Sequence, residues 1–355
     1  MKNFEIKGYS ANALCDNHIH PHIRIPLTES TEIYKKVINY LNYDKFAIQA
    51  LPSYSITNNL EGLYYKSVFS NAFVNCGLIH GIQEDYLEQV KKLYAMGCDG
   101  VKMLEGKPDY RKELGKPLDH PSFDEFYAFI EEKQLPLLLH FGDPREFWDI
   151  EKIPKWAIER GWFYDESFIP FDEGQKEVER VLEKFPKLHL ILAHFFFVSD
   201  AYDYAVEFIE KWPNVCFDIT PGTEMYFNFD TDERWRDFFI KYQDRILYGT
   251  DTYNWQQKDM TFDFRYAHAV NLIRSFLEGL EPFVDEWTNR TFKNPFGLNE
   301  SVLDKIYYKN FVRLYGNNPR ALNKKLILDE CKKVNTENLG DIEKENLNYI
   351  IEEFS

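Results

Sequence analysis

The chain has 355 residues and a formal net charge of −16, from 58 acidic and 42 basic side chains. An acidic chain without a run of lysines or arginines lacks a basic face for phosphate groups, which argues against nucleic acid or an anionic membrane as a partner. No apolar run is long enough to cross a bilayer, and the N-terminal residues lack the basic and apolar pattern of a signal peptide. We therefore expect a cytoplasmic protein.

Strand-like and helical segments alternate along the whole chain. The strand-like apolar runs cover residues 13–20, 45–51, 73–82, 99–104, 135–141, 188–195, 214–220 and 245–251. The helical segments cover residues 31–43, 61–72, 84–96, 122–133, 175–185, 200–212, 233–242 and 262–280. Amphipathic patterns after residue 299 predict further helices, which we expect on the outer wall of the fold.

This alternation predicts an α/β fold of the (β/α)8 TIM-barrel type. Continuous apolar runs are typical of parallel strands that helices cover from outside, and eight such units close into a barrel. An open doubly wound sheet is disfavoured, because no glycine-rich phosphate loop follows the first run. We expect one domain over residues 1–355, with the barrel at about 13–315 and a C-terminal helical extension at about 316–355.

The cysteines indicate a reducing environment. Five are present without C-x-x-C spacing, and several lie in apolar runs: Cys15, Cys76, Cys98, Cys216 and Cys331. A small thiol fits well in a protein interior. We expect them to be reduced core residues, as is usual in a cytoplasmic protein.

Four histidines and one aspartate fall at the ends of predicted strands. His18 and His20 end the first strand in D-N-H-I-H, and alternate residues of a strand point the same way. His140 ends the fifth strand, His194 the sixth, and Asp251 the eighth. The carboxyl ends of the strands form the active-site rim of a TIM barrel. Imidazole and carboxylate groups gathered there match the preference of zinc and similar divalent ions, with one position left for water.

The same segments resemble a known family. D-N-H-I-H, L-L-L-H-F-G-D-P, L-I-L-A-H-F and I-L-Y-G-T-D resemble strand ends of the amidohydrolase superfamily, and K-I-Y-Y-K-N-F-V-R-L-Y-G resembles the segment that closes its domain. The resemblance extends from residue 13 to about 315. It is closest to the amidohydrolase-related (amidohydrolase 2) branch, which includes aminocarboxymuconate semialdehyde decarboxylase and several lactone and ester hydrolases.

Transferred residue by residue, the resemblance implies a ligand set for the metal: His18, His20, His140 and Asp251. His194 would then be a catalytic histidine or a ligand of a second ion. In binuclear members a lysine at the end of strand four is carboxylated and bridges two metals, and Lys102 lies in that strand. Because the related branch carries a lysine in a similar setting without bridging, we expect one ion, Zn²⁺, and an ammonium group at Lys102.

These residues suit a hydrolase that uses an activated water molecule. A divalent cation with an open position lowers the pKa of bound water towards ~7, so that hydroxide is available at neutral pH. Asp251 would accept the proton of that water and could pass it to the leaving group. His194 would hydrogen-bond the substrate carbonyl or act as the acid/base partner. The reaction would be hydrolysis of an ester, lactone or amide.

Two other functions stay open. The same cation could hold a carboxylate while His194 or Asp251 protonates the carbon, which describes a non-oxidative decarboxylase. The sequence barely separates this reaction from hydrolysis. A barrel that kept its metal and lost catalysis is the second alternative, although nothing in the sequence supports it.

Three features near the rim concern the substrate, which we expect to be a small molecule. Residues 143–174 form a long stretch with three tryptophans, typical of a lid or binding element, although contact with a neighbouring subunit would also explain it. Arg145 in this stretch and Arg24 beyond the first strand are candidates to bind a substrate carboxylate. The alternative for each is a surface ion pair. Whether the chain forms a homo-oligomer stays open.

Overall fold

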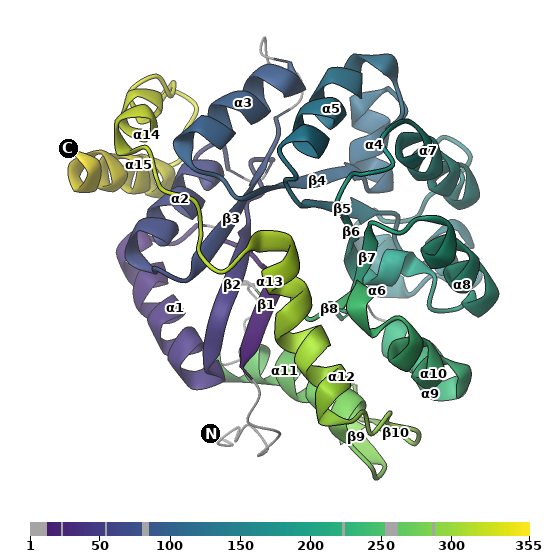
Figure 1. The fold of residues 1–355 in the computed structure, drawn as a ribbon. Helices are drawn as coiled ribbons and strands as arrows, with labels where there is room; N and C mark the ends of the chain where they lie inside the picture. Colours follow the sequence, from purple (N-terminus) through teal and green to yellow (C-terminus); the bar gives the residue numbers. More distant parts are fainter. Residues whose placement is uncertain are drawn as a thin grey trace.

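The computed structural model describes residues 13–22, 24–53, 55–79, 85–221, 224–252, 262–285 and 288–355. Eight parallel strands follow one another in sequence order, and helices surround them on the outside (Figure 1). The strands are β1 (Leu14–Ile19), β2 (Tyr43–Gln49), β3 (Ala72–Gly77), β4 (Gly100–Gly106), β5 (Leu137–Phe141), β6 (Leu190–Leu192), β7 (Val215–Asp218) and β8 (Ile246–Leu247). The predicted TIM barrel is confirmed.

The barrel closes between β8 and β1. The predicted metal ligands His18 and Asp251 lie at this closure. The backbone N–H of Asn17 donates to the Tyr248 carbonyl at 3.0 Å, and the N–H of Asp251 donates to the His18 carbonyl at 2.7 Å. Backbone hydrogen bonds fix the register of neighbouring strands. The chain ends that carry His18 and Asp251 are therefore held side by side.

Eight helices correspond to the predicted helical segments. They are α1 (Leu27–Leu41), α2 (Asn58–Val68), α3 (Tyr86–Met96), α5 (Asp124–Glu132), α7 (Phe171–Lys184), α8 (Tyr202–Lys211), α10 (Arg234–Lys241) and α11 (Phe262–Glu278). The boundaries of α3 have clear local causes. Asp85 accepts the N–H of Glu88 at 2.8 Å as an N-cap, and the helix ends at Gly97 with φ 113°, a conformation that glycine adopts readily. Residues 80–82 of the predicted third strand lie outside the described residues.

Several short elements were not predicted. They are α4 (Pro108–Leu114), α6 (Lys155–Glu159), α9 (Met225–Thr231) and the antiparallel pair β9 (Phe283–Asp285) and β10 (Arg290–Phe292). Each is too short to give a periodic apolar pattern in the sequence. None of the helices in the described parts of the chain is long and apolar enough to cross a membrane.

The C-terminal part of the chain adds four helices, and one of them closes the N-terminal end of the barrel. They are α12 (Glu300–Asp304), α13 (Asn310–Tyr315), α14 (Lys324–Cys331) and α15 (Asp341–Phe354). Phe311 of α13 packs against Cys15 and Phe73, near the starts of β1 and β3, and Leu314 packs against inward-facing residues of later strands. The expectation that these helices all lie on the outer wall is wrong for α13, because its apolar face fills the N-terminal end of the barrel.

The last two C-terminal helices, α14 and α15, do lie on the outer wall. Lys92 of α3 forms an ion pair with Glu330 of α14 at 2.8 Å, and the rings of Tyr64 in α2 and Tyr349 in α15 are 5.5 Å apart. Figure 1 shows this pair of helices at one side of the barrel, while α12 and α13 cross its end.

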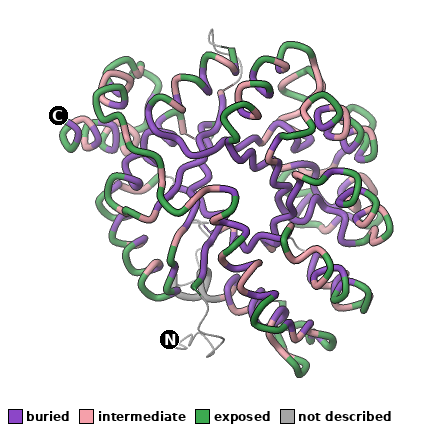
Figure 2. The backbone as a smooth tube through the Cα atoms, viewed as in Figure 1, coloured by how far each residue is buried: buried purple, intermediate pink, exposed green. Residues whose placement is uncertain are grey.

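A buried polar layer lies between the apolar plug and the active-site rim. The side-chain amide of Asn17 donates to Asp218 Oδ2 at 3.1 Å, and that of Gln49 donates to the Asn17 carbonyl at 2.7 Å. The amide of Asn75 donates to the Tyr315 hydroxyl at 2.7 Å. Figure 2 shows that burial follows the strands and the inward faces of the helices. A buried network of this kind fixes the side chains directly beneath the histidines.

The prediction of reduced cysteines is wrong for two of the five. Cys76 at the end of β3 and Cys98 before β4 form a disulfide, with their Cα atoms 6.2 Å apart. The β3–α3–β4 unit brings the two residues together although 22 positions separate them, so the sequence carries no C-x-x-C signal. Cys15, Cys216 and Cys331 are buried free thiols, as predicted. The cysteines therefore do not indicate a reducing compartment.

Candidate metal centre and active site

His18 and His20, at the end of β1, form the first part of the site. Both side chains are buried, and their Nε2 atoms lie 3.2 Å apart, in agreement with their predicted common face. The Nδ1 atom of His20 lies 2.7 Å from the Gln49 carbonyl, which can only accept, so Nδ1 carries the proton. The Nδ1 atom of His18 lies 2.7 Å from Asp218 Oδ2. Both Nε2 atoms therefore present lone pairs to the same point.

Asp251 supplies a carboxylate at that point. It follows β8 in a left-handed conformation with φ 54°, and its Oδ1 lies 2.9 Å from His20 Nε2 and 3.6 Å from His18 Nε2. Burial raises the pKa of this carboxyl, but the nearby imidazoles of His20 and His18 outweigh burial and hold the pKa well below its usual range. Asp251 is therefore an anion at neutral pH.

The three donor atoms have the spacing that a metal ion requires. Their separations of 2.9, 3.2 and 3.6 Å compare with about 3.4 Å between ligand atoms bound tetrahedrally at about 2.1 Å. The Nδ1 atoms of the two rings already face the Asp218 carboxylate and the Gln49 carbonyl, which leaves both Nε2 atoms available to a metal ion. Two imidazole nitrogens and a carboxylate oxygen thus converge on one point. These residues fit a divalent cation.

His140 and His194 line the same pocket but are not part of this three-residue cluster. Their ring centres are 4.8 Å apart, and the ring of His194 is 5.7 Å from that of His18. Among the residues that the structure describes, the buried Nε2 atom of His140 has no hydrogen-bond partner, since Asp143 Oδ1 lies 3.8 Å away. Burial lowers the pKa of His140 and lowers that of His194 to about 4, so both rings are neutral at pH 7.

The sequence predicted that His194 ends a strand, and this prediction is wrong. β6 stops at Leu192, and His194 begins a turn of four left-handed residues, His194–Phe197, with φ between 50° and 58°. This conformation costs roughly 1–2 kcal/mol for each residue other than glycine. The N–H of His194 donates to Asp218 Oδ1 at 3.2 Å and holds the start of the turn. Backbone strain of this kind is typical of functional sites, and here it brings His194 and Phe197 into the pocket.

Lys102 of β4 reaches the same site. Its side chain is buried, and its Nζ lies 3.4 Å from His18 Nε2. Burial lowers the pKa of Lys102 to about 8, against the opposing effect of Asp251 and Asp218. The amine thus stands next to the ligand cluster, where it can donate a hydrogen bond as an ammonium group. Whether Lys102 becomes carboxylated stays a prediction, as does its role as a second-site ligand.

The cluster lies in a pocket of about 250 Å³ at the C-terminal ends of the strands. The predicted covering segment, residues 143–174, supplies a third of its lining: Asp143, Pro144, Phe147, Trp156, Arg160 and Trp162. The segment contains α6 and joins α7 at Phe171, four residues before the predicted helix start. It therefore forms a folded wall of the pocket with an aromatic inner surface.

A comparison with known protein families places the chain in one of them. A family model described as amidohydrolase matches residues 68–316, which is more than two thirds of the chain. The chain belongs to the amidohydrolase family. The matched span begins after His18 and His20, so the place of these two residues in the amidohydrolase site rests on the geometry given above. No curated protein matches the sequence.

Solved structures share the fold of this amidohydrolase at low identity. An uncharacterised TIM-barrel protein from Bordetella bronchiseptica has a TM-score of 0.53 and 12% identity over 86% of this chain and 99% of its own. A protein assigned as a 2-pyrone-4,6-dicarboxylic acid hydrolase from Pseudomonas putida has 0.52 and 11% over 87% and 99%. 5-Carboxyvanillate decarboxylase from Sphingomonas paucimobilis has 0.50 and 12% over 86% and 99%. At these identities the likeness concerns the fold alone.

The two arginines predicted to bind substrate do not line the metal pocket of the amidohydrolase. Arg24 is exposed and has φ 60°. Arg145 donates to Asp172 at 2.6 Å, and its guanidinium lies 4.0 Å from the centre of the Phe171 ring. It lines a neighbouring pocket instead. A substrate contact through Arg24 or Arg145 therefore stays a prediction.

Asp218 contacts the candidate site and was missed by the sequence analysis. It ends β7, is fully buried, and holds His18 Nδ1 at 2.7 Å with one oxygen while the other accepts the N–H of Thr220 at 2.9 Å. A carboxylate behind a ligand histidine fixes its tautomer and orientation. The signal was present in the sequence, because an aspartate ends the apolar run V-C-F-D at the same rim.

A second group of side chains that the sequence analysis missed lies beside His140. The Nζ of Lys107 donates to Asp143 Oδ2 at 2.7 Å and to the Tyr164 hydroxyl at 2.9 Å, and it lies 4.7 Å from the centre of the Trp162 ring. Lys107 and Tyr164 are 57 positions apart, so no local pattern in the sequence joins them. The group fixes the covering segment against β4 at the edge of the pocket.

Proposed function

We propose that this amidohydrolase is a metal-dependent hydrolase that cleaves an ester, lactone or amide bond of a small substrate. One observation carries the proposal. His18 Nε2, His20 Nε2 and Asp251 Oδ1 converge at 2.9 to 3.6 Å in a pocket at the C-terminal rim of the barrel. Nitrogen and oxygen donors with open positions are the arrangement of catalytic metal sites.

The proposed ligands are His18, His20 and Asp251, with His140 as a further ligand. The buried Nε2 of His140 in the same pocket supports its inclusion, because a buried nitrogen without a hydrogen bond is costly unless something else binds it. Zn²⁺ suits this mixed donor set, and one ion agrees with the single cluster found among the described residues. When bound, such an ion polarises a carbonyl group and makes water acidic enough to act as a nucleophile near neutral pH.

Asp251 is the proton carrier in this proposal. Its side chain is 30% exposed and lines the pocket, and its lowered pKa keeps the carboxylate ionised. The carboxylate accepts a proton from the attacking water and delivers it to the leaving group.

Lys102 and His194 have different roles in the proposal. Nδ1 of His194 lies 3.4 Å from the Thr220 carbonyl, so the neutral ring carries its proton there and offers a lone pair at Nε2. His194 therefore acts as a base or as a ligand. The ammonium of Lys102 is a donor beside the cluster, and we assign to it the hydrogen bond to the substrate carbonyl oxygen.

In this proposal the aromatic wall of the pocket shields the reacting bond from bulk solvent, apart from the attacking water. Phe147, Trp156 and Trp162 come from the covering segment, and Phe197 comes from the left-handed turn. The guanidinium of Arg160 lies 5.1 Å from the centre of the Trp162 ring. A carboxylate on the substrate would meet Arg160 in this pocket, in place of Arg24 or Arg145.

Decarboxylation is the second candidate, and the positive charge of the pocket favours it. Lys102 and Arg160 both line the cavity around the ligand cluster, where they could hold a substrate carboxylate. His194 or Asp251 would then protonate the carbon that loses carbon dioxide. This reaction needs no attacking water.

One experiment separates the two reactions. The protein, with its metal content measured, is incubated in water labelled with ¹⁸O together with panels of esters, lactones, amides and aromatic carboxylates. Hydrolysis places ¹⁸O in the acid product and releases no carbon dioxide. Carbon dioxide release without ¹⁸O in the product would contradict the hydrolase proposal, and no turnover of any panel by metal-loaded protein would favour a barrel without catalysis.

A further inference from the structure

A second pocket lies directly beside the metal pocket. Its volume is about 430 Å³, larger than that of the metal pocket itself. Pro144 and Phe197 line both cavities. The short helical turn Arg145–Trp148 forms the wall between them, since Phe147 lines the metal pocket while Arg145, Glu146 and Trp148 line the second one. The two cavities are therefore neighbours on one rim.

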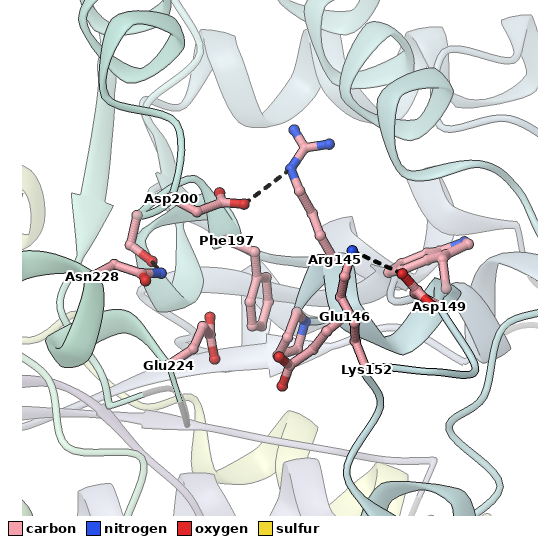
Figure 3. A pocket seen from close by; sticks show the side chains of 11 residues that line it. Arg145, Glu146, Asp149, Lys152, Phe197, Asp200, Glu224 and Asn228 are labelled. Atoms are coloured by element: carbon pink, nitrogen blue, oxygen red, sulfur yellow. Dashed lines mark hydrogen bonds and ion pairs between the residues drawn. The ribbon is translucent and has the colours of Figure 1, made fainter. Parts of the chain in front are cut away.

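Carboxylates outnumber cations in the lining of the second pocket (Figure 3). Its acidic residues are Glu146, Asp149, Asp200 and Glu224, and its basic residues are Arg145 and Lys152. Both basic residues already face carboxylates. Lys152 lies 2.8 Å from Asp149, and Arg145 lies 2.6 Å from Asp172 and 3.7 Å from Asp200. Among the described residues that line the cavity, acidic side chains thus outnumber basic ones.

Aromatic rings stand among these carboxylates. Phe197 and Trp148 both line the cavity, and in Figure 3 the carboxylates of Glu146 and Glu224 flank the Phe197 ring. Burial raises the pKa of Glu146, and no charged group of the described chain offsets that effect. Carboxylates and aromatic faces together are the groups that recognise an organic ammonium ion.

We propose that the second pocket binds a protonated amine at the far end of an elongated substrate, whose reacting bond lies in the metal pocket. The inference rests on the proposed hydrolase function for the reacting end alone. Phe197 and Pro144 form the junction that the chain of the substrate passes, and the left-handed turn that begins at His194 holds Phe197 there. Glu146 selects the amine, and Phe197 sets the path between the two ends.

The test compares two esters of equal length with the metal-loaded protein. p-Nitrophenyl 6-aminohexanoate and p-nitrophenyl heptanoate differ only in an ammonium group in place of a methyl group. In both, water adds to the acyl carbon, the acyl C–O bond breaks, and p-nitrophenol and a carboxylic acid are released. We expect kcat/KM for the amino ester to be higher by about tenfold. The p-nitrophenyl esters of 4-aminobutanoate and 8-aminooctanoate then show which length of the substrate chain spans the two pockets.

Glu146→Gln keeps the shape of the side chain and should abolish the preference for the amino ester. The matched control is Glu166→Gln, an exposed carboxylate of the same segment that lines neither pocket, and it should keep the preference. Equal kcat/KM for the two esters in the wild-type protein would overturn the inference and leave the hydrolase proposal intact. So would a preference that survives in Glu146→Gln.

A binding measurement decides the case in which neither ester is cleaved, which would count against hydrolysis of such esters. Calorimetric titration with hexylamine then tests the second pocket by itself. Binding to the wild-type protein and to Glu166→Gln, with loss in Glu146→Gln, supports the amine site. Absence of binding to the wild-type protein overturns it.

Discussion

At the scale of single residues, the metal cluster depends on the groups that hold the ligands as well as on the ligands. Asp218 fixes the ring of His18, and the Gln49 carbonyl fixes the ring of His20, each through Nδ1 at 2.7 Å. These bonds leave Nε2 unprotonated and aimed at Asp251. The orientation of two ligands on β1 is thus determined by residues on β2 and β7.

Asp218→Asn should weaken metal binding without removing a ligand. The variant loses the charge that fixes the His18 tautomer, and the loss of such a partner lowers metal affinity by about 10- to 100-fold. Zinc affinity is measured by titration against a competing chelator. Asp237→Asn on α10, whose side chain is 83% exposed, is the matched control. Equal affinity of Asp218→Asn and the wild-type protein would contradict this role.

Asp251→Asn should lower kcat far more than it raises KM. An amide can still occupy the site but cannot accept a proton, and loss of a general base costs about 10²- to 10⁴-fold in rate. The assay is run with metal in excess and bound metal quantified in the same sample. A kcat equal to that of the wild-type protein, at equal metal content, would rule out the proton-carrier role.

At the scale of elements, the disulfide joins the end of β3 to the start of β4, the strand that carries Lys102. A crosslink that closes a loop of 22 residues restricts the unfolded chain and stabilises the folded one by about 3 kcal/mol. The chain is therefore held by a covalent bond just before β4, and β4 itself by its backbone pairing with β3 and β5.

Removal of this bond should lower the free energy of unfolding by about 3 kcal/mol. Denaturant unfolding of the wild-type protein with and without reductant measures the effect, and the Cys76→Ala/Cys98→Ala double variant should not respond to reductant. A thiol reagent in denaturant should react only with the three cysteines that are free in the structure: Cys15, Cys216 and Cys331. Reaction of all five thiols would disprove the disulfide.

Most of the barrel could be predicted because its signals are local. A buried parallel strand is a continuous apolar run, and its C-terminal end is where polar residues resume, so His18, His140 and Asp251 could be placed on the rim. The disulfide and the bond between Lys107 and Tyr164 could not be predicted, since they join residues that only the folded chain brings together. The turn at His194 was missed because phenylalanines after an apolar run continue the pattern of a strand.

At the scale of the whole molecule, the barrel is closed by its own C-terminal chain at one end and presents its histidines at the other. Phe311 and Leu314 of α13 fill the lower interior, the amides of Asn17 and Asn75 lie above them, and the ligand cluster forms the rim. The residues that stabilise the barrel thus lie at its N-terminal end, and the candidate site lies at its C-terminal end, as is general for TIM barrels.

Leu314→Ala should therefore destabilise the protein without changing its metal affinity. Leu314 is 7% exposed, and truncation of such a buried leucine costs about 2–5 kcal/mol. Leu280→Ala is the matched control, because Leu280 is 83% exposed and should change the free energy of unfolding by less than about 0.5 kcal/mol. A loss of zinc affinity in Leu314→Ala under conditions where the protein is folded would contradict the separation of the two ends.

We propose that one divalent cation is bound by His18, His20 and Asp251, with His140 as a further ligand. This claim is tested most directly by a crystal structure of the zinc-loaded protein with anomalous scattering measured at the zinc edge. We expect one strong peak at about 2.1 Å from His18 Nε2, His20 Nε2 and an Asp251 oxygen. A map without a peak among these three side chains, or a pair of peaks bridged by a carboxylated Lys102, would contradict the claim.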